Sequence, residues 1–279
     1  MMKLCELQAL IIDMDGVLYR GNTPIAGAQA FMAWLEACQF PFVLVTNNST
    51  LDAQAYERKL AAMDICVPAS QILTSAVATA DYLAHNFAPG SRVFVVGESG
   101  LEMSVAARGF VLTDQRPEVV VVGYDRQLTY AKLRTAALAI RAGARFIATN
   151  PDRTLPTEAG QVPGAGSIVA ALVAATDQEP LVIGKPGPHM FELALATLQR
   201  PRERTAVLGD HLMIDILGGQ RLGLPTILVL SGVTEVAPSP NDPVQPTWIF
   251  DDLQQVACAW RESVGDVPAQ QQRRPLRAR

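Results

Sequence analysis

The chain has 279 residues, of which 49% are hydrophobic and 18% are charged, and its formal net charge is -4. This composition supplies enough apolar surface for a folded core and excludes a largely disordered chain. Basic residues number 23 and acidic residues 27, so the basic excess that favours a nucleic-acid polymer or an anionic membrane is missing, and we expect a small-molecule ligand.

The length favours a core that carries a second, smaller domain. The apolar runs are shorter than the ~20 residues needed to cross a bilayer, and the first residues lack the apolar stretch and cleavage site of a signal peptide. We therefore expect a cytoplasmic protein. The four cysteines are scattered without a C-x-x-C pair, so we expect reduced, mostly buried thiols.

Short apolar runs rich in Val and Ile alternate along the chain with longer stretches of helical periodicity. This pattern is typical of βα units around buried, mainly parallel strands, and it predicts the α/β class. In chain order, strands are predicted at 9–12, 42–45, 93–96, 119–122, 145–148, 181–183, 206–208 and 226–230. Polar clusters follow the strands before about residue 50 and after about residue 184, which predicts an inserted domain between them.

The first polar cluster is Asp13-Met-Asp15-Gly16, directly after the strand at 9–12. Residues i and i+2 of an extended chain point to the same side, and a glycine allows a sharp turn, so both carboxylates can address one small volume. Their mutual repulsion favours a bound cation or a raised pKa on one of them, which suits one nucleophile and one proton donor. The alternative is an ordinary surface turn.

The second cluster, Thr46-Asn47-Asn48-Ser49, follows the strand at 42–45 and precedes a helix predicted to begin near Leu51. Hydroxyl and amide donors at a helix start form a natural phosphate site, and we assign Thr46 to phosphate. Ser49 is the predicted N-cap of that helix.

The third cluster is Gly184-Lys185-Pro186, after the strand at 181–183. A lone lysine is usually a surface charge, but here it lies between a strand end and a proline that restricts its backbone. Lys185 is therefore a candidate for neutralising a phosphoryl group.

The fourth cluster begins at Asp210, after the strand at 206–208, and includes His211 and Asp215. Both aspartates can turn toward a cation above the sheet, and oxygen ligands are those that magnesium prefers. Asp215 could instead decorate the first turn of a helix, and His211 is a weaker candidate because magnesium seldom recruits imidazole.

The order of these four clusters resembles the haloacid dehalogenase superfamily, whose four motifs lie on a Rossmann-like core. Segments 149–152, 163–167 and 230–234 further resemble its subfamily IIA, the branch of NagD and the 4-nitrophenyl, phosphoglycolate and pyridoxal phosphatases. The resemblance covers roughly residues 5 to 260.

The resemblance implies a role for each residue. Asp13 would be the nucleophile, Asp15 the acid and base, and Thr46, Asn47 and Lys185 the phosphate-binding residues. Mg²⁺ would be held by Asp13, the Asp15 backbone carbonyl and Asp210, with Asp215 binding through water or anchoring the other ligands.

The resemblance also implies a C2-type α/β cap at 76–180, inserted in a core formed by 1–75 and 181–262. The remaining C-terminal tail, 263–279, is Arg-rich in its last ten residues, and we expect it to be solvated. Substrate contacts would come from Asn150, Asp152 and Gly164, although the glycines there could serve turns or helix packing instead. The branch often dimerises through its cap, so a homodimer is possible.

The predicted function is Mg²⁺-dependent hydrolysis of small phosphomonoesters through an aspartyl-phosphate intermediate. The substrate would be a nucleotide monophosphate, a sugar phosphate, phosphoglycolate or p-nitrophenyl phosphate. Asp15 argues against dehalogenation and phosphonate cleavage, which do without a leaving-group acid. An alternative of another class is a non-catalytic phosphoaspartate switch or phosphate-binding module, which a base at Asp15 would disfavour.

Overall fold

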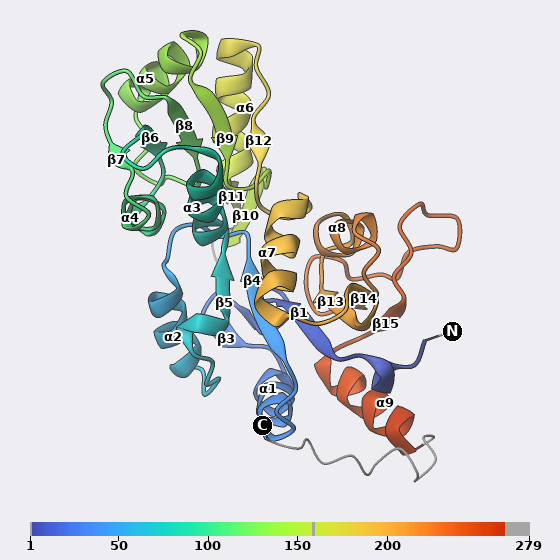
Figure 1. Cartoon of the computed structure of the whole chain (residues 1–279). Helices are drawn as coiled ribbons and strands as arrows, with labels where there is room; N and C mark the ends of the chain where they lie inside the picture. Colours follow the sequence, from blue (N-terminus) through green and yellow to red (C-terminus); the bar gives the residue numbers. More distant parts are fainter. Residues whose placement is uncertain (1, 158–159, 266–279) are drawn as a thin grey trace.

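The computed structural model describes residues 2–157 and 160–265, which form two parallel β-sheets with helices packed on them (Figure 1). The larger sheet has six strands, all parallel, in the order β15-β14-β13-β1-β4-β5. Their bounds are β1 Ala9–Asp13, β4 Phe42–Thr46, β5 Ile72–Thr74, β13 Thr205–Gly209, β14 Thr226–Val229 and β15 Trp248–Phe250. The first two and β13 are buried along their whole length, as their unbroken apolar runs predict.

The second sheet has five parallel strands in the order β12-β9-β8-β6-β7. These are β6 Arg92–Val96, β7 Val111–Leu112, β8 Val119–Val122, β9 Arg145–Ala148 and β12 Leu181–Val182. Because Leu181 and Val182 pair with Ile147 and Ala148, the second sheet extends two residues beyond the predicted limit at 180. The α/β class and the predicted strands are confirmed.

Helices connect the strands of both sheets. They are α1 Ala28–Ala37, α2 Ala53–Ala61, α3 Ser75–Asn86, α4 Ser99–Ala107, α5 Tyr130–Arg141, α6 Ala165–Thr176, α7 Pro188–Leu198, α8 Leu217–Arg221 and α9 Leu253–Gly265. Shorter elements are the hairpins β2 Tyr19–Arg20 with β3 Thr23–Pro24 and β10 Thr154–Thr157 with β11 Gly160–Pro163, the 3₁₀ turns Leu4–Glu6, Ala69–Gln71 and Arg202–Arg204, and a π-helical turn Leu212–Ile216.

The N-cap of α2 differs from the prediction. Asp52 caps the helix, because its carboxylate accepts a hydrogen bond of 2.7 Å from the backbone N–H of Ala55. Ser49 is almost fully buried and lies instead near Thr149, with 3.4 Å between the two hydroxyl oxygens. The chain thus continues three residues past Ser49 before the helix starts, which leaves residues 46–49 free to face the second sheet.

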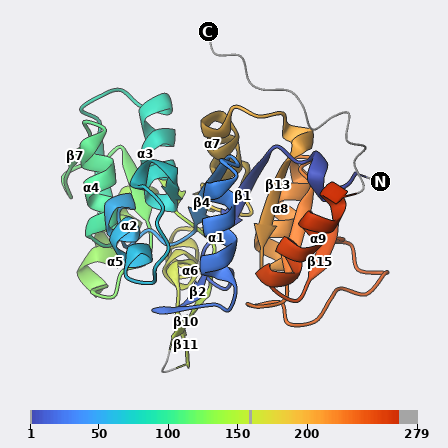
Figure 2. The ribbon, with the colours of Figure 1, turned by 90° about the horizontal axis from the view of Figure 1, so that it is seen from below.

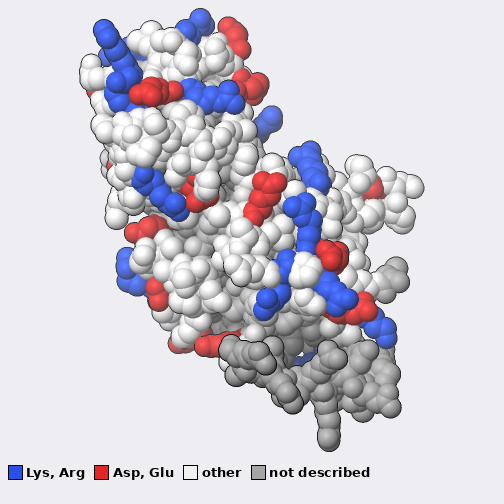
Figure 3. Space-filling model, viewed as in Figure 1, with Lys and Arg blue, Asp and Glu red and all other residues white. Residues whose placement is uncertain are grey.

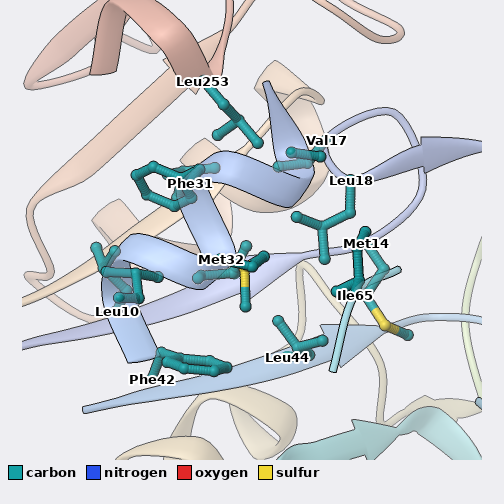
Figure 4. Close-up of a cluster of buried hydrophobic side chains, with 14 of the residues drawn as sticks. Leu10, Met14, Val17, Leu18, Phe31, Met32, Phe42, Leu44, Ile65 and Leu253 are labelled. Carbon is teal, nitrogen blue, oxygen red and sulfur yellow. The ribbon is translucent and has the colours of Figure 1, made fainter. Parts of the chain in front are cut away.

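One apolar core lies between the six-stranded sheet and helices α1, α2 and α9. Leu10 and Leu44 from the strands, Phe31 and Met32 from α1 and Leu253 from α9 pack together there (Figure 4). Helices α1 and α9 lie side by side on this face (Figure 2). Each such side chain stabilises the fold by roughly 1.5–3 kcal/mol when fully buried, so this layer fixes β1 and β4 as a rigid base for the residues at their ends.

A second core joins the two sheets through α3, α4 and α7. It contains Val43 and Val45 from the six-stranded sheet, Val93 and Val121 from the five-stranded sheet, and Phe191 from α7. Helices α5 and α6 cover the other face of the five-stranded sheet with a third apolar cluster. The carboxyl ends of both sets of strands are therefore held at fixed places.

The surface corrects one prediction and leaves others open. Cys38, Cys66 and Cys258 are exposed and Cys5 is half-buried, so the expectation of mostly buried thiols was wrong, although all four are free.

Basic and acidic side chains are intermixed on the face in Figure 3. Within 2–157 and 160–265 no helix is long and apolar enough to cross a membrane. The predicted tail begins inside α9, and residues 266–279 lie outside the described residues.

Candidate active site

The four predicted polar clusters meet at one place. Asp13 ends β1, Thr46 ends the neighbouring β4, and Asp210 follows β13, which pairs with the other side of β1. Lys185 arrives from the five-stranded sheet, three residues after β12. Ligands of parallel α/β sheets bind beyond the carboxyl ends of the strands, and these side chains occupy that position.

Lys185 is the centre of the site. Its ammonium lies 2.5 Å from Asp13 Oδ1 and 2.7 Å from Asp215 Oδ1, and only 2% of the residue is exposed. Gly184 allows this approach, because a Cβ there would lie 2.4 Å from the Thr149 carbonyl oxygen and 2.7 Å from Asn47 Oδ1. Buried charges need such partners, so Lys185 is held ready to pair with negative charge.

A group of three buried carboxylates could hold a metal ion. Asp13, Asp210 and Asp215 each offer an oxygen within 4.8 Å of the others. Hard oxygen donors in this number suit magnesium, which keeps part of its water shell. Both oxygens of Asp215 already have partners, since Oδ1 pairs with Lys185 and Oδ2 accepts a hydrogen bond from the His211 backbone N–H. The donor set fits Mg²⁺, with Asp13 and Asp210 the carboxylates better placed for direct contact.

Burial perturbs the acids of this group. It raises the pKa of Asp13 well above its usual range, where the Lys185 ammonium opposes the shift and Asp215 and Asp210 add to it. Burial and the nearby Asp215 raise the pKa of Asp210 to about 7. A cation bound beside Asp13 and Asp210 would favour the ionised form of both carboxyl groups.

Without metal, the free energy of unfolding is expected to fall by about 2 kcal/mol between pH 5.5 and pH 8. An unfolded aspartate loses its proton near pH 4, whereas folded Asp210 keeps its proton to about 7. The proton held by the folded state stabilises it at low pH, and this stabilisation is lost as the pH rises through 7. Urea unfolding in EDTA measures the change, Asp210→Asn should reduce it, and a metal-free stability that rises over this range would contradict it.

Asp15 lies two residues after Asp13, and its side chain reaches solvent. Crowding by the surrounding protein raises its pKa, and Lys59, Lys185 and the hydroxyls of Tyr19 and Thr46 partly oppose this. The Tyr19 hydroxyl is 3.4 Å from Asp15 Oδ2. A carboxyl with a raised pKa at an open position can keep its proton and still meet a leaving group.

Thr46 and Asn47 lie at the end of β4, as predicted, and both are almost fully buried. Asn47 Oδ1 accepts from the Lys185 backbone N–H at 2.8 Å, and its Nδ2 donates to the Lys185 carbonyl at 2.9 Å and to the Asp152 carboxylate at 3.1 Å. The Asn47 side chain thus positions Lys185 and Asp152. Its role at phosphate stays a prediction, as does that of Thr46.

The three predicted substrate residues gather on the five-stranded side. Asn150 Nδ2 donates to the Asn47 carbonyl at 2.7 Å, and its Oδ1 accepts from the Asp152 backbone N–H at 3.1 Å. Gly164 packs on the same loop, since a Cβ there would lie 2.4 Å from the Asp152 carbonyl oxygen. Only Asp152 offers a partly accessible polar group, so we consider it the best placed of the three for substrate.

Some residues near the site were missed by sequence reasoning. Tyr19 contacts Asp15, and Lys59 lies 4.0 Å from the centre of the Tyr19 ring. Val233 donates a backbone hydrogen bond of 2.6 Å to Asp210 Oδ2. The sequence marks segment 230–234 only by its resemblance to the family, and no local signal connects Tyr19 or Lys59 to Asp15.

His211, the weaker candidate of the fourth cluster, caps the π-helical turn, where its Nδ1 accepts a hydrogen bond from the Met213 N–H at 3.3 Å.

Family comparisons match both halves of the site. A model described as haloacid dehalogenase-like hydrolase matches residues 10–111, and a second model for HAD-like hydrolases matches residues 182–256. The chain is 41% identical over 250 residues to an acid sugar phosphatase of Staphylococcus saprophyticus, covering 89% of this chain and 96% of that protein.

Solved structures share the whole fold. The 4-nitrophenylphosphatase of Thermotoga maritima has a TM-score of 0.86 at 36% identity, covering 92% of this chain and 98% of its own. NagD of E. coli K-12 has a TM-score of 0.82 at 36% identity, covering 90% and 98%. A glycerol phosphate phosphatase of Mycobacterium tuberculosis, solved in complex with magnesium, has a TM-score of 0.82 at 37% identity, covering 92% and 78%.

Proposed function

The chain belongs to the haloacid dehalogenase-like hydrolases, in the branch of NagD and the 4-nitrophenylphosphatases, and is a phosphatase; from this premise we propose that it hydrolyses small phosphomonoesters with Mg²⁺ through an aspartyl-phosphate on Asp13. The observation that carries the proposal is the Lys185 ammonium between Asp13 and Asp215, with Asp210 beside them. It supports an anionic nucleophile with a cation at its side. The non-catalytic alternative is not favoured by any of these relatives.

In the first half of the proposed reaction, an Asp13 carboxylate oxygen attacks phosphorus and the bond from phosphorus to the leaving oxygen breaks. Asp15 donates its proton to that oxygen, and such proton transfer is worth ~10²–10⁴ in rate. Lys185 and Thr46 hold the phosphoryl oxygens. Asp13, Asp210 and the Asp15 carbonyl would hold a magnesium ion, with Asp215 as their anchor, and the ion would supply positive charge between the phosphate dianion and the carboxylates.

In the second half, Asp15 accepts a proton from water while the water oxygen attacks the phosphorus of the aspartyl-phosphate. The bond between phosphorus and Asp13 breaks, which releases inorganic phosphate and restores both carboxyl groups. Burial raises the pKa of Asp15, and this suits the exchange, because a carboxyl with a raised pKa holds a proton more readily and can still return it.

For the substrate, we propose a sugar or polyol phosphate. Relatives named acid sugar phosphatase and glycerol phosphate phosphatase support this class. The partly accessible Asp152 carboxylate, held by Asn47 Nδ2 at 3.1 and 3.3 Å, can accept hydrogen bonds from hydroxyl groups of a neutral leaving group. The same carboxylate would repel the second charge of phosphoglycolate.

The test is release of phosphate from a panel of esters in Mg²⁺ and in EDTA. We expect glycerol and hexose phosphates to exceed phosphoglycolate in kcat/KM by about tenfold, the effect of ~1.4 kcal/mol, and p-nitrophenyl phosphate to be cleaved as well. In EDTA all rates should fall by about 10³-fold or more. Full activity in EDTA would refute the metal, and a preference for phosphoglycolate would refute the substrate class.

The division into a cap and a core follows the two sheets. We propose that residues 76–182 act as the cap and that 1–75 and 183–265 form the core, with the upper cap limit shifted because β12 pairs in the second sheet. A homodimer through the cap and a cytoplasmic location stay predictions.

A further inference from the structure

The loop after β14 crosses directly over Asp210. Val233 donates its backbone N–H to Asp210 Oδ2 at 2.6 Å, and the Thr234 N–H donates to the Asp210 backbone carbonyl at 3.1 Å. The Thr234 hydroxyl in turn accepts the Leu212 N–H at 3.0 Å, at the start of the turn that carries Asp215. Residues 231–234, called the 231–234 loop below, therefore contact the first aspartate of the fourth motif and the start of the turn that leads to the second.

Two glycines enclose the same carboxylate oxygen. A Cβ on Gly232 would lie 1.8 Å from Asp210 Oδ2, and a Cβ on Gly16 would lie 2.2 Å from it. Gly16 also has a φ of +85°, whereas the φ of Gly232 lies outside the left-handed region. The backbone conformation at Gly232 is therefore one that any residue can adopt. A side chain at this position is excluded only because its Cβ would clash with Asp210.

The 231–234 loop is also tied to the first motif. The Ser231 hydroxyl donates to the Gly16 carbonyl at 2.8 Å. Arg20, from the hairpin that follows the first motif, donates to the Ser231 carbonyl at 2.6 Å. These two hydrogen bonds, each between residues more than 200 positions apart in the sequence, fix the turn that carries Asp13 and Asp15 relative to Asp210.

We propose that the 231–234 loop is a positioning element for magnesium, which fixes Asp210 Oδ2 through Gly232 and Val233 and leaves Oδ1 to coordinate the ion. Hydrogen bonds that orient metal-binding carboxylates commonly decide affinity, and losing one costs about 10–100-fold. The inference rests on the proposed function, because it requires a magnesium ion at Asp13 and Asp210. The loop residues themselves stay outside the reacting atoms.

The test is Mg²⁺ binding to the full-length chain by isothermal titration calorimetry. Gly232→Ala should raise the Kd by at least about tenfold, because Asp210 must move. Ser231→Ala and Thr234→Val should raise it by about 3- to 10-fold, as expected for one neutral hydrogen bond, and Thr234→Ser should restore it. At saturating Mg²⁺, the Ser231 variant and both Thr234 variants should keep wild-type kcat and KM.

Val233→Ala is the matched control, since it keeps the backbone N–H and shortens a side chain that is 60% exposed; its Mg²⁺ affinity should be unchanged. If Gly232→Ala does not fold, Ser231→Ala and Thr234→Val test the proposal. Wild-type Mg²⁺ affinity in both of these variants would overturn the positioning role. A wild-type chain that binds no Mg²⁺ would instead overturn the proposed metal, so the two failures are distinguishable.

Discussion

Asp13→Asn is expected to lower kcat for p-nitrophenyl phosphate by about 10⁴-fold or more, a loss of the size seen when other covalent hydrolases lose their nucleophile. The amide keeps the shape of the side chain but lacks an anionic oxygen to attack phosphorus. It also removes one of the two acids that pair with Lys185. Steady-state kinetics at saturating Mg²⁺ measures the effect.

The fold should survive this change. Lys185 keeps its ion pair with buried Asp215 at 2.7 Å, and the amide oxygen of the new Asn can still accept a hydrogen bond from the ammonium, so the loss of metal-free unfolding free energy should be smaller than the about 3–5 kcal/mol expected when a buried pair is broken outright. Asp114→Asn makes the same chemical change at an exposed position in the loop between β7 and β8 and should keep wild-type kcat. If Asp13→Asn kept kcat within tenfold of wild type, Asp13 would not be the nucleophile.

In the proposed reaction, Asp13 and Lys185 would act together. A carboxylate approaching a phosphate dianion needs positive charge nearby, and the folded chain supplies it from the end of β12, on the other sheet. Asn47 holds both the N–H and the carbonyl of Lys185 and also the Asp152 carboxylate. The position of the cation is therefore linked to the residue best placed to contact the leaving group.

The strands and the four polar clusters could be predicted from sequence because each depends on a local pattern. The apolar runs of β1, β4 and β13 are buried along their length, and the polar residues come directly after them. Strands β5 and β15 escaped prediction, since three residues each give too little pattern to separate them from loops. The N-cap at Asp52 escaped because Ser49, Thr50 and Asp52 are all good capping residues.

Contacts between distant segments could not be predicted. Asn47 and Asp152 are 105 residues apart and Ser231 and Gly16 are 215 apart, and nothing near either residue marks its partner. The chemistry of an amide or a hydroxyl permits many partners, and only the folded chain selects one. The sequence therefore predicted which polar residues follow the strands and meet at their ends, but not the distant residues that hold them in place.

Lys185→Met is expected to lower the metal-free unfolding free energy by about 3–5 kcal/mol, because it leaves Asp13 and Asp215 buried without their cation. Added Mg²⁺ should recover much of this loss, since the ion would supply charge at the same carboxylates. The kcat should fall by about 10²–10³-fold even at saturating Mg²⁺, as for the loss of one charged group that stabilises a transition state. Urea unfolding with and without Mg²⁺, and steady-state kinetics, measure the two effects.

Lys132→Met is a close control, because Lys132 pairs with buried Asp125 at 2.6 Å, nearly the 2.7 Å between Lys185 and Asp215. It lies in α5 on the second sheet and keeps 33% of its side chain exposed. Its loss should weaken the fold without Mg²⁺-dependent recovery and without a change in kcat. The two lysines thus separate the cost of breaking a buried ion pair from the loss of a charge that acts on phosphate. Equal recovery by Mg²⁺ in both variants, or wild-type kcat in Lys185→Met, would show that Lys185 serves the fold alone.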